Sequence, residues 1–140
     1  MTHYQQTIEL ETRGKSFTKV TQNIEKIVAA SGIKTGLCTV FLRHTSASLI
    51  IQENADPDVL QDLEIFLSRL VPESNDYIHN AEGSDDMPAH IRSVLTHTSE
   101  QIPIIQGQLG LGTWQGIYLW EHRKYPHTRE LIVHISGDSY

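Results

Sequence analysis

The sequence predicts an α+β fold, a mainly antiparallel sheet or sandwich backed by helices, in a single domain spanning residues 1–140. Three observations favour this class. A length of 140 residues is typical of one domain and allows a core to form without disulfide bonds. Segments that alternate apolar and polar residues are interspersed with segments whose apolar residues recur every three or four positions. Most connections between the predicted strands are short, which favours antiparallel pairing.

The first predicted elements are a strand, a helix and two further strands. Residues 4–11 alternate apolar and polar side chains, as expected of a half-buried strand. Ser16 is expected to cap a helix, and Gly32 to end it in the left-handed conformation. The apolar face of this helix consists of Phe17, Val20, Ile24, Ile27 and Val28. Apolar runs around Cys38 and Leu49 predict the next two strands.

A second helix is predicted at residues 57–70, because Asp56-Pro57 combines a capping side chain with a proline in the first turn. The segment from Glu73 to Met87 has no apolar period and many turn formers. It is expected to be a long loop, for which a functional role and disorder are the two explanations. Pro88 is expected to open a short helix with His90 in its first turn.

The last predicted elements are strands. Residues 102–105 and 108–111 are expected to pair as a hairpin that turns at Gly107. Residues 113–121 and 131–135 predict the final two strands.

Composition limits the classes of function. The net charge is −6, and no basic run is present to displace counterions, so the sequence argues against a nucleic-acid binder. No apolar run reaches the length of a membrane span and the first residues do not resemble a signal segment, so no membrane association and a cytoplasmic location are expected. Cys38, the single cysteine, lies in an apolar strand and is expected to be a core residue.

Polar side chains gather at the ends of the predicted strands around Cys38 and Leu49. His44 follows the first of them, and Glu53 and Asn54 follow the second. Rigid strand ends commonly present the side chains of a site, although an ordinary polar turn has the same composition.

Three histidines are candidates for a metal site: His44 at a strand end, His79 in the polar loop and His90 in a helix. Three neutral imidazoles would leave an open position on zinc, which is the arrangement of a catalytic site. Their spacing does not form a compact metal motif, so histidines that are each satisfied by separate hydrogen bonds remain the alternative.

Other side chains are suited to a phosphorylated ligand. Arg123 and Arg129 flank a turn and could hold a phosphate, although solvated surface arginines are the common alternative. Trp114 offers a flat apolar wall, and Gln115 offers a paired donor and acceptor for a heteroaromatic ring.

Four motifs follow one another between residues 44 and 117. They are His44-Thr-Ser-Ala-Ser-Leu, Gln52-Glu-Asn-Ala-Asp-Pro-Asp, His79 with Glu82-Gly-Ser-Asp-Asp-Met-Pro-Ala-His90, and Leu111-Gly-Thr-Trp-Gln-Gly-Ile. In these residues and their order, the sequence resembles the YjbQ family, described as secondary thiamine-phosphate synthases. The resemblance implies a homotrimer of antiparallel α+β subunits with a pocket that gathers the three histidines. The implied activity joins hydroxymethylpyrimidine diphosphate to a thiazole phosphate with loss of pyrophosphate.

That reaction suggests roles for the candidate residues, because departing pyrophosphate requires a divalent cation or arginines to neutralise its charge. Carboxylates, among them Glu53, Asp85 and Asp86, could hold magnesium. We expect His44, Glu53 and Asp86 to be catalytic, Asn54, Trp114, Gln115 and Arg129 to bind substrate, and His44, His79 and His90 to bind zinc or magnesium. Two alternatives are a zinc hydrolase, with Glu53 or Asp86 as general base, and a non-catalytic trimer that binds a small ligand.

Overall fold

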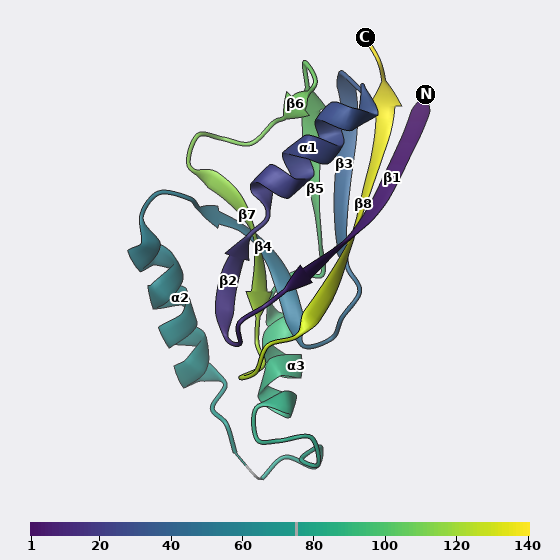
Figure 1. The fold of residues 1–140 in the computed structure, drawn as a ribbon. Coiled ribbons are helices and arrows are strands. Elements are labelled where there is room, and N and C mark those ends of the chain that lie inside the picture. Colours follow the sequence, from purple (N-terminus) through teal and green to yellow (C-terminus); the bar gives the residue numbers. More distant parts are fainter. Residues whose placement is uncertain (75) are drawn as a thin grey trace.

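The computed structural model describes residues 1–74 and 76–140, in which the chain forms eight strands and three helices (Figure 1). The strands are β1 (Thr2–Glu11), β2 (Ser16–Lys19), β3 (Thr35–Leu42), β4 (Ala47–Glu53), β5 (Ser99–Ile105), β6 (Gln108–Leu109), β7 (Gln115–Glu121) and β8 (Thr128–Asp138). The helices are α1 (Thr21–Ser31), α2 (Pro57–Leu70) and α3 (Asp86–Leu95). Strands pair antiparallel throughout the described ladders, which confirms the predicted fold class.

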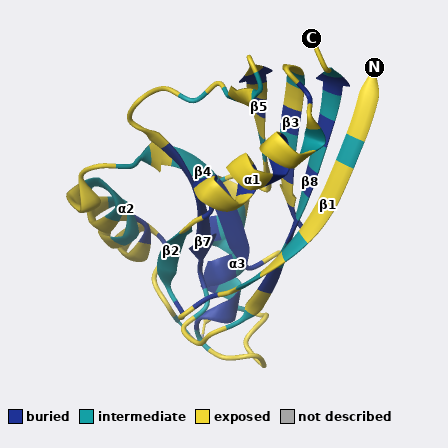
Figure 2. Ribbon diagram, turned by 45° about the horizontal axis from the view of Figure 1, so that its top comes forward, coloured by how far each residue is buried: buried dark blue, intermediate teal, exposed yellow. Residues whose placement is uncertain are grey.

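The strands form two sheets. The larger has the order β1-β8-β3-β5-β6, and the smaller has the order β2-β7-β4. The longest ladder joins β1 to β8, from the pair Thr2 and Gly137 to the pair Glu11 and Thr128. Figure 2 shows that β1 is largely exposed, whereas β7, in the middle of the smaller sheet, is buried. The smaller sheet is therefore covered on both faces, and the larger sheet has an exposed edge.

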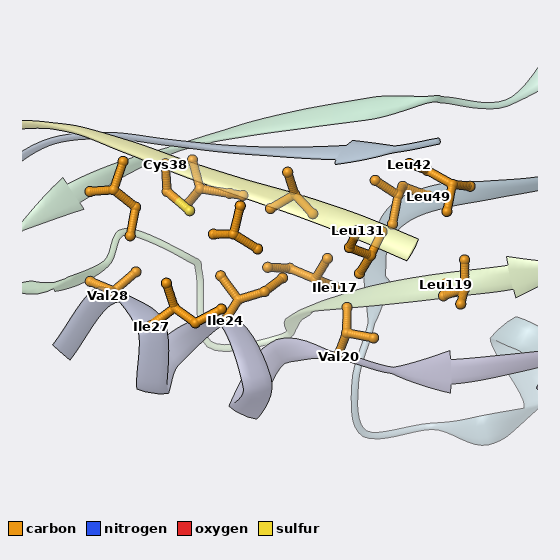
Figure 3. Close-up of a cluster of buried hydrophobic side chains, with 14 of the residues drawn as sticks. Val20, Ile24, Ile27, Val28, Cys38, Leu42, Leu49, Ile117, Leu119 and Leu131 are labelled. Carbon is orange, nitrogen blue, oxygen red and sulfur yellow. The ribbon is translucent and has the colours of Figure 1, made fainter. Parts of the chain in front are cut away.

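The main core lies between α1 and the inner faces of the two sheets (Figure 3). Val20, which directly precedes α1, and Ile24, Ile27 and Val28 of α1 pack there. Their neighbours are Cys38 and Leu42 of β3, Leu49 of β4, Ile117 and Leu119 of β7, and Leu131 of β8. Each fully buried aliphatic side chain contributes roughly 1.5–3 kcal/mol of transfer free energy. Gly32 ends α1 with φ of 71°, as the sequence predicts.

Helix α2 covers the opposite face of the smaller sheet. Leu67 and Val71 pack there against Trp120, whose ring stacks on Phe17 at a centroid distance of 4.5 Å. The helix begins as predicted, since the Asp56 side chain accepts a hydrogen bond from the Asp58 N–H at 2.9 Å.

The prediction that Ser16 caps a helix is wrong. Residues 16–19 form β2, in which Phe17 lies opposite Trp120 of β7. The Ser16 hydroxyl donates to the Gly14 carbonyl, and the helix begins only at Thr21. Pairing with β7 is a tertiary interaction, and it overrides the local helical pattern.

Helix α3 also begins elsewhere than predicted, at Asp86 and not at Pro88. The earlier start places Asp86 and His90 four residues apart on one helical face. The expected loop before α3 is present, and its residue 75 lies outside the described residues.

The predicted hairpin is confirmed: β5 pairs with β6, and Gln106 and Gly107 both have positive φ between them. No helix within residues 1–74 and 76–140 combines the length and the apolarity needed to cross a bilayer.

Candidate metal centre

His79, Asp86 and His90 converge at the start of α3. One ligand atom from each lies within 4.8 Å of the other two. Asp86 Oδ2 is 2.6 Å from His79 Nε2 and 3.1 Å from His90 Nε2. In a tetrahedral zinc site, ligand atoms about 2.0–2.2 Å from the metal lie about 3.3 Å from one another, so small side-chain movements would admit an ion.

Helix α3 and the loop before it set this geometry. Asp86 and His90 are one helical turn apart, and their side chains are 3% and 30% exposed. His79 comes from the loop and is 46% exposed. Gly83 turns the chain into the helix with φ of 106°, where a Cβ atom would come within 2.9 Å of an Asp85 carboxylate oxygen. The site is thus a buried carboxylate beneath two solvent-accessible imidazoles.

The tautomer of His90 is fixed by the turn between β3 and β4. His90 Nδ1 lies 2.9 Å from the Thr45 carbonyl oxygen, so Nδ1 carries the proton and donates it. With the proton on Nδ1, the second ring nitrogen, Nε2, points towards Asp86 and offers a lone pair wherever it carries no proton of its own. Two acceptors that face each other need a cation between them, either a proton or a metal ion.

Asp86 is held in its ionised form. Burial alone raises the pKa of its carboxyl group, but the hydrogen bond with His79 and the charge of Arg123 outweigh burial and lower the pKa below its ordinary value. Arg123 Nη1 lies 2.8 Å from Asp86 Oδ1, the oxygen that does not face the histidines. An anionic carboxylate is the form that binds a metal.

His79 is matched to this carboxylate. The hydrogen bond with Asp86 raises the pKa of His79, and the charges of Asp86 and Glu82 add to the effect. Glu82 Oε2 lies 3.2 Å from His79 Nε2. Two carboxylates therefore attract positive charge to the same imidazole nitrogen.

His44 is not part of the group formed by His79, Asp86 and His90. Its Nε2 accepts a hydrogen bond from the Glu130 N–H at 2.8 Å, so its proton lies on Nδ1. Burial lowers the pKa of His44, and the charge of Arg129 lowers it further. His44 is therefore a neutral donor through its Nδ1–H, because the lone pair of Nε2 already accepts the Glu130 N–H.

Glu53, Asn54, Trp114 and Gln115 lie together at the other end of the smaller sheet, where Glu53 is opposite Gln115. Seven residues of β4 separate this end from Ser46, a distance of about 20 Å. The Glu53 carboxylate accepts from the backbone N–H groups of the turn before α2, and Asn54 Nδ2 donates to the carbonyls of the facing loop. Asn54 and Gln115 line a cavity of about 290 Å³, and Trp114 is 65% exposed.

Arg129 is buried and lies in a hydrogen-bond network, where its guanidinium forms an ion pair with Glu121 and donates to Ser46. The phosphate-binding role predicted for Arg129 would require release from these partners. Of the two arginines considered, Arg123 is the one beside the metal centre.

A second buried network surrounds His122, which the sequence did not single out. Arg92 Nε donates to His122 Nδ1 at 3.0 Å, so the proton lies on Nε2 and is donated to the Ser48 hydroxyl at 2.8 Å. His122 in this tautomer is unable to accept a proton from Ser48. The pair is therefore structural and does not act as nucleophile and base.

Sequence reasoning also missed Asp86 as a partner of the two histidines. The available signal was the spacing of Asp86 and His90, which share a helical face once the helix is extended to Asp86. The contact of Arg123 with Asp86 joins distant segments and has no local signal.

The family model for UPF0047 YjbQ-like proteins matches residues 6–138. A UPF0047 protein from Synechocystis sp. is 64% identical over 96% of this chain and 92% of its own length. UPF0047 protein YjbQ from Escherichia coli O157:H7 is 41% identical over 96% of this chain and 99% of its own length.

Solved structures agree with this match. A YbjQ-like protein of unknown function from Sulfolobus solfataricus superposes with a TM-score of 0.90 at 27% identity, covering 98% of this chain and 99% of that one. An uncharacterised YjbQ/UPF0047 protein from Clostridium acetobutylicum has a TM-score of 0.86 at 40% identity, covering 93% and 98%. The chain therefore belongs to the YjbQ (UPF0047) family.

Proposed function

We propose that this protein is a divalent-metal-dependent enzyme whose reaction centre is formed by His79, Asp86 and His90. The reaction we assign to it is thiamine-phosphate synthesis, in which the thiazole nitrogen displaces pyrophosphate from hydroxymethylpyrimidine diphosphate. The resemblance to the YjbQ family supports this reaction, and the positions of the three side chains support this centre.

The convergence of three ligand atoms carries the proposal. Two imidazole nitrogens and one carboxylate oxygen lie within 4.8 Å of one another. Imidazole ligands favour zinc and other transition metals, whereas magnesium prefers oxygen ligands and bound water. Zinc is therefore the ion that this set is best suited to hold. A bound ion would neutralise charge on a phosphate oxygen and act as a Lewis acid.

The histidine at the neighbouring turn has a separate role in this proposal. His44 presents a neutral Nδ1–H, because its Nε2 already accepts from the Glu130 backbone. A donor of this kind can bind an anionic oxygen of the departing diphosphate. Thr45, its neighbour in the chain, accepts from His90, so the two histidines are linked through one turn.

A zinc-dependent hydrolase is the second candidate, and the exposure of the centre favours it. His79 is 46% exposed, and the Glu82 carboxylate lies 3.2 Å from its Nε2 with 64% exposure. Two histidines and one carboxylate leave coordination positions for water. Glu82 would then be the general base, since Glu53 lies at the far end of β4.

The proposed assembly is a homotrimer. Leu37 and Phe41 of β3 and Ile105 of β5 are 36%, 45% and 59% exposed on the larger sheet. Apolar side chains on a sheet face favour coverage by another protein surface. Light scattering at micromolar concentration should give three times the mass of the chain, and a monomer mass would contradict the trimer.

The test begins with elemental analysis of protein purified without a histidine tag. One zinc or other transition-metal ion per chain is expected in the wild type, and His90→Ala and Asp86→Asn should lose it. Synthesis of thiamine phosphate is then measured with both substrates on metal-free and metal-loaded protein. Wild-type protein that binds no transition metal when titrated would overturn the proposed centre.

The two candidate reactions are separated by their products. Metal-dependent formation of thiamine phosphate supports the synthase. Metal-dependent release of phosphate from a phosphorylated compound supplied alone, without formation of thiamine phosphate, would favour the hydrolase.

A further inference from the structure

Arg123, which follows β7, spreads its guanidinium group over one short segment of the chain. Its Nε donates to Asp85 Oδ2 at 2.9 Å, Nη1 contacts Asp86 Oδ1 at 2.8 Å and Nη2 donates to the Glu82 carbonyl at 2.9 Å. Each of the three guanidinium nitrogens thus has a partner between residues 82 and 86. That segment leads into α3 and contains the carboxylate of the candidate metal centre.

These contacts determine which oxygen of Asp86 is available. Arg123 occupies Oδ1, and Oδ2 faces His79 and His90. The Asp86 side chain is 3% exposed and that of Arg123 is 18% exposed, so water competes weakly for this pair. The carboxylate is held in one orientation, suited to a metal bond through a single oxygen.

Arg123 is itself fixed to the end of the sheet. Its backbone N–H and that of His122 both donate to Glu121 Oε2. The next residue, Lys124, donates its backbone N–H to Asp85 Oδ2 at 2.9 Å. Glu121 is in turn paired with the buried Arg129. The loop segment is therefore attached to a rigid strand end through both side-chain and backbone bonds.

We propose that Arg123 is the positioning residue of the metal centre: it orients Asp86 towards the two histidines and keeps the segment from Glu82 to Asp86 ordered before an ion binds. The role in metal affinity rests on the proposed function. Loss of a partner that orients a metal ligand typically weakens metal binding by about 10–100-fold.

Three variants test the proposal. Arg123→Gln removes both the positive charge and the planar, multiply donating guanidinium group. Arg123→Lys keeps the positive charge but lacks the planar group. Lys124→Gln is the matched control, because its side chain is 43% exposed and pairs with Glu73, while its backbone bond to Asp85 remains. Circular dichroism establishes that each variant is folded.

The first measurement is hydrogen exchange in the metal-free proteins. The amides of Asp86 and Ala89, which donate to the Gly83 and Asp85 carbonyls, should exchange about tenfold faster or more in Arg123→Gln, and at the wild-type rate in Lys124→Gln. Equal protection of these amides in folded Arg123→Gln would overturn the positioning role, whether or not the protein binds metal.

The second measurement is metal affinity, determined by competition with a chromophoric chelator. Zinc should bind Arg123→Gln about 10–100-fold more weakly than wild type, Arg123→Lys to an intermediate degree and Lys124→Gln equally well. The visible spectrum of the cobalt-loaded protein reports the ligand geometry. It should change most in Arg123→Gln, less in Arg123→Lys and not at all in Lys124→Gln.

The metal centre and the positioning role of Arg123 can be rejected independently of each other. Unchanged zinc affinity and cobalt spectrum in Arg123→Gln would reject the role of Arg123 and leave the metal centre in place. Absence of binding in the wild type would reject the metal centre, and hydrogen exchange would still decide whether Arg123 orders the segment.

Discussion

The guanidinium group of Arg129 and the carboxylate of Glu121 form a two-point ion pair in the protein interior. Arg129 Nε lies 2.8 Å from Glu121 Oε1, and Nη2 contacts Oε2, with the two side chains 5% and 0% exposed. The same Nη2 also donates to the Ser46 hydroxyl, and the Thr12 hydroxyl donates to Glu121 Oε1. This pair fixes the end of β7 next to the metal centre.

Removing one partner of this pair should destabilise the protein. Arg129→Met leaves the Glu121 carboxylate buried without its counter-charge, which costs about 3–5 kcal/mol in the free energy of unfolding. Urea denaturation of the wild type and the variant gives the difference. The double variant Glu121→Gln with Arg129→Met is the control and should recover part of the loss. A single variant as stable as wild type would mean that the pair contributes little.

The free energy of unfolding should decrease as the pH is lowered below 6.5, because His122 then takes up a proton in the unfolded state but not in the folded state. Burial lowers the pKa of His122 to about 2, with the charges of Arg92 and Arg129 as further causes, against an ordinary value of 6.5. The unfolded state therefore binds the additional proton below pH 6.5, and stability decreases by up to about 1.4 kcal/mol per pH unit.

The window for this measurement is pH 4.5 to 6.5. Half-buried carboxylates such as Glu64, whose pKa is lowered by hydrogen bonds with Arg92 and Ser68 that outweigh burial, contribute mainly below the ordinary value of 4.5. His44, with a lowered pKa, contributes in the same direction as His122. His122→Gln keeps one acceptor and one donor, and it should reduce the slope; an unchanged slope would contradict the assignment.

Zinc should stabilise the folded protein through the proposed centre. At a free zinc concentration 100 times the dissociation constant, the gain is about 2.7 kcal/mol, which appears as a rise in Tm. Chelation should reverse the rise in wild type, and His79→Ala should show a much smaller one. Equal shifts in both proteins would indicate that zinc binds elsewhere.

Substitutions at the far end of the smaller sheet should leave metal affinity unchanged. Asn54→Ala removes the bonds to the carbonyls of Thr113 and Gln115, so loop 112–115 should become more susceptible to proteolysis. About 20 Å of strand β4 lies between this end and the centre, so zinc affinity should agree with wild type within twofold. A larger loss would show that the two ends are coupled.

Local signals accounted for most of the elements. Helix α2 was predictable because Asp56 caps it and Pro57 occupies its first turn, both of which are interactions within a few residues. Strand β2 was not, because its conformation depends on pairing with β7, about 100 residues away in the chain.

The candidate site was predictable in part for the same reason. His79 and His90 were identified from residue type and from their position beside a polar loop. Asp86 was expected to act in catalysis and was not recognised as their partner, because the start of α3 was placed two residues too late. Burial of Arg129 depends on Glu121 and Ser46 together, and the sequence around Arg129 alone resembles an exposed basic turn.

The position of β8 has a consequence for how the chain folds. This strand follows all others along the chain, yet it lies between β1 and β3 in the larger sheet (Figure 1). Among the described strands β1 pairs with β8 alone, so it has no strand to pair with until β8 has been synthesised, and the contacts it then makes are among the most distant in sequence. Such topologies fold slowly, and an unpaired ten-residue strand is exposed to aggregation in the meantime.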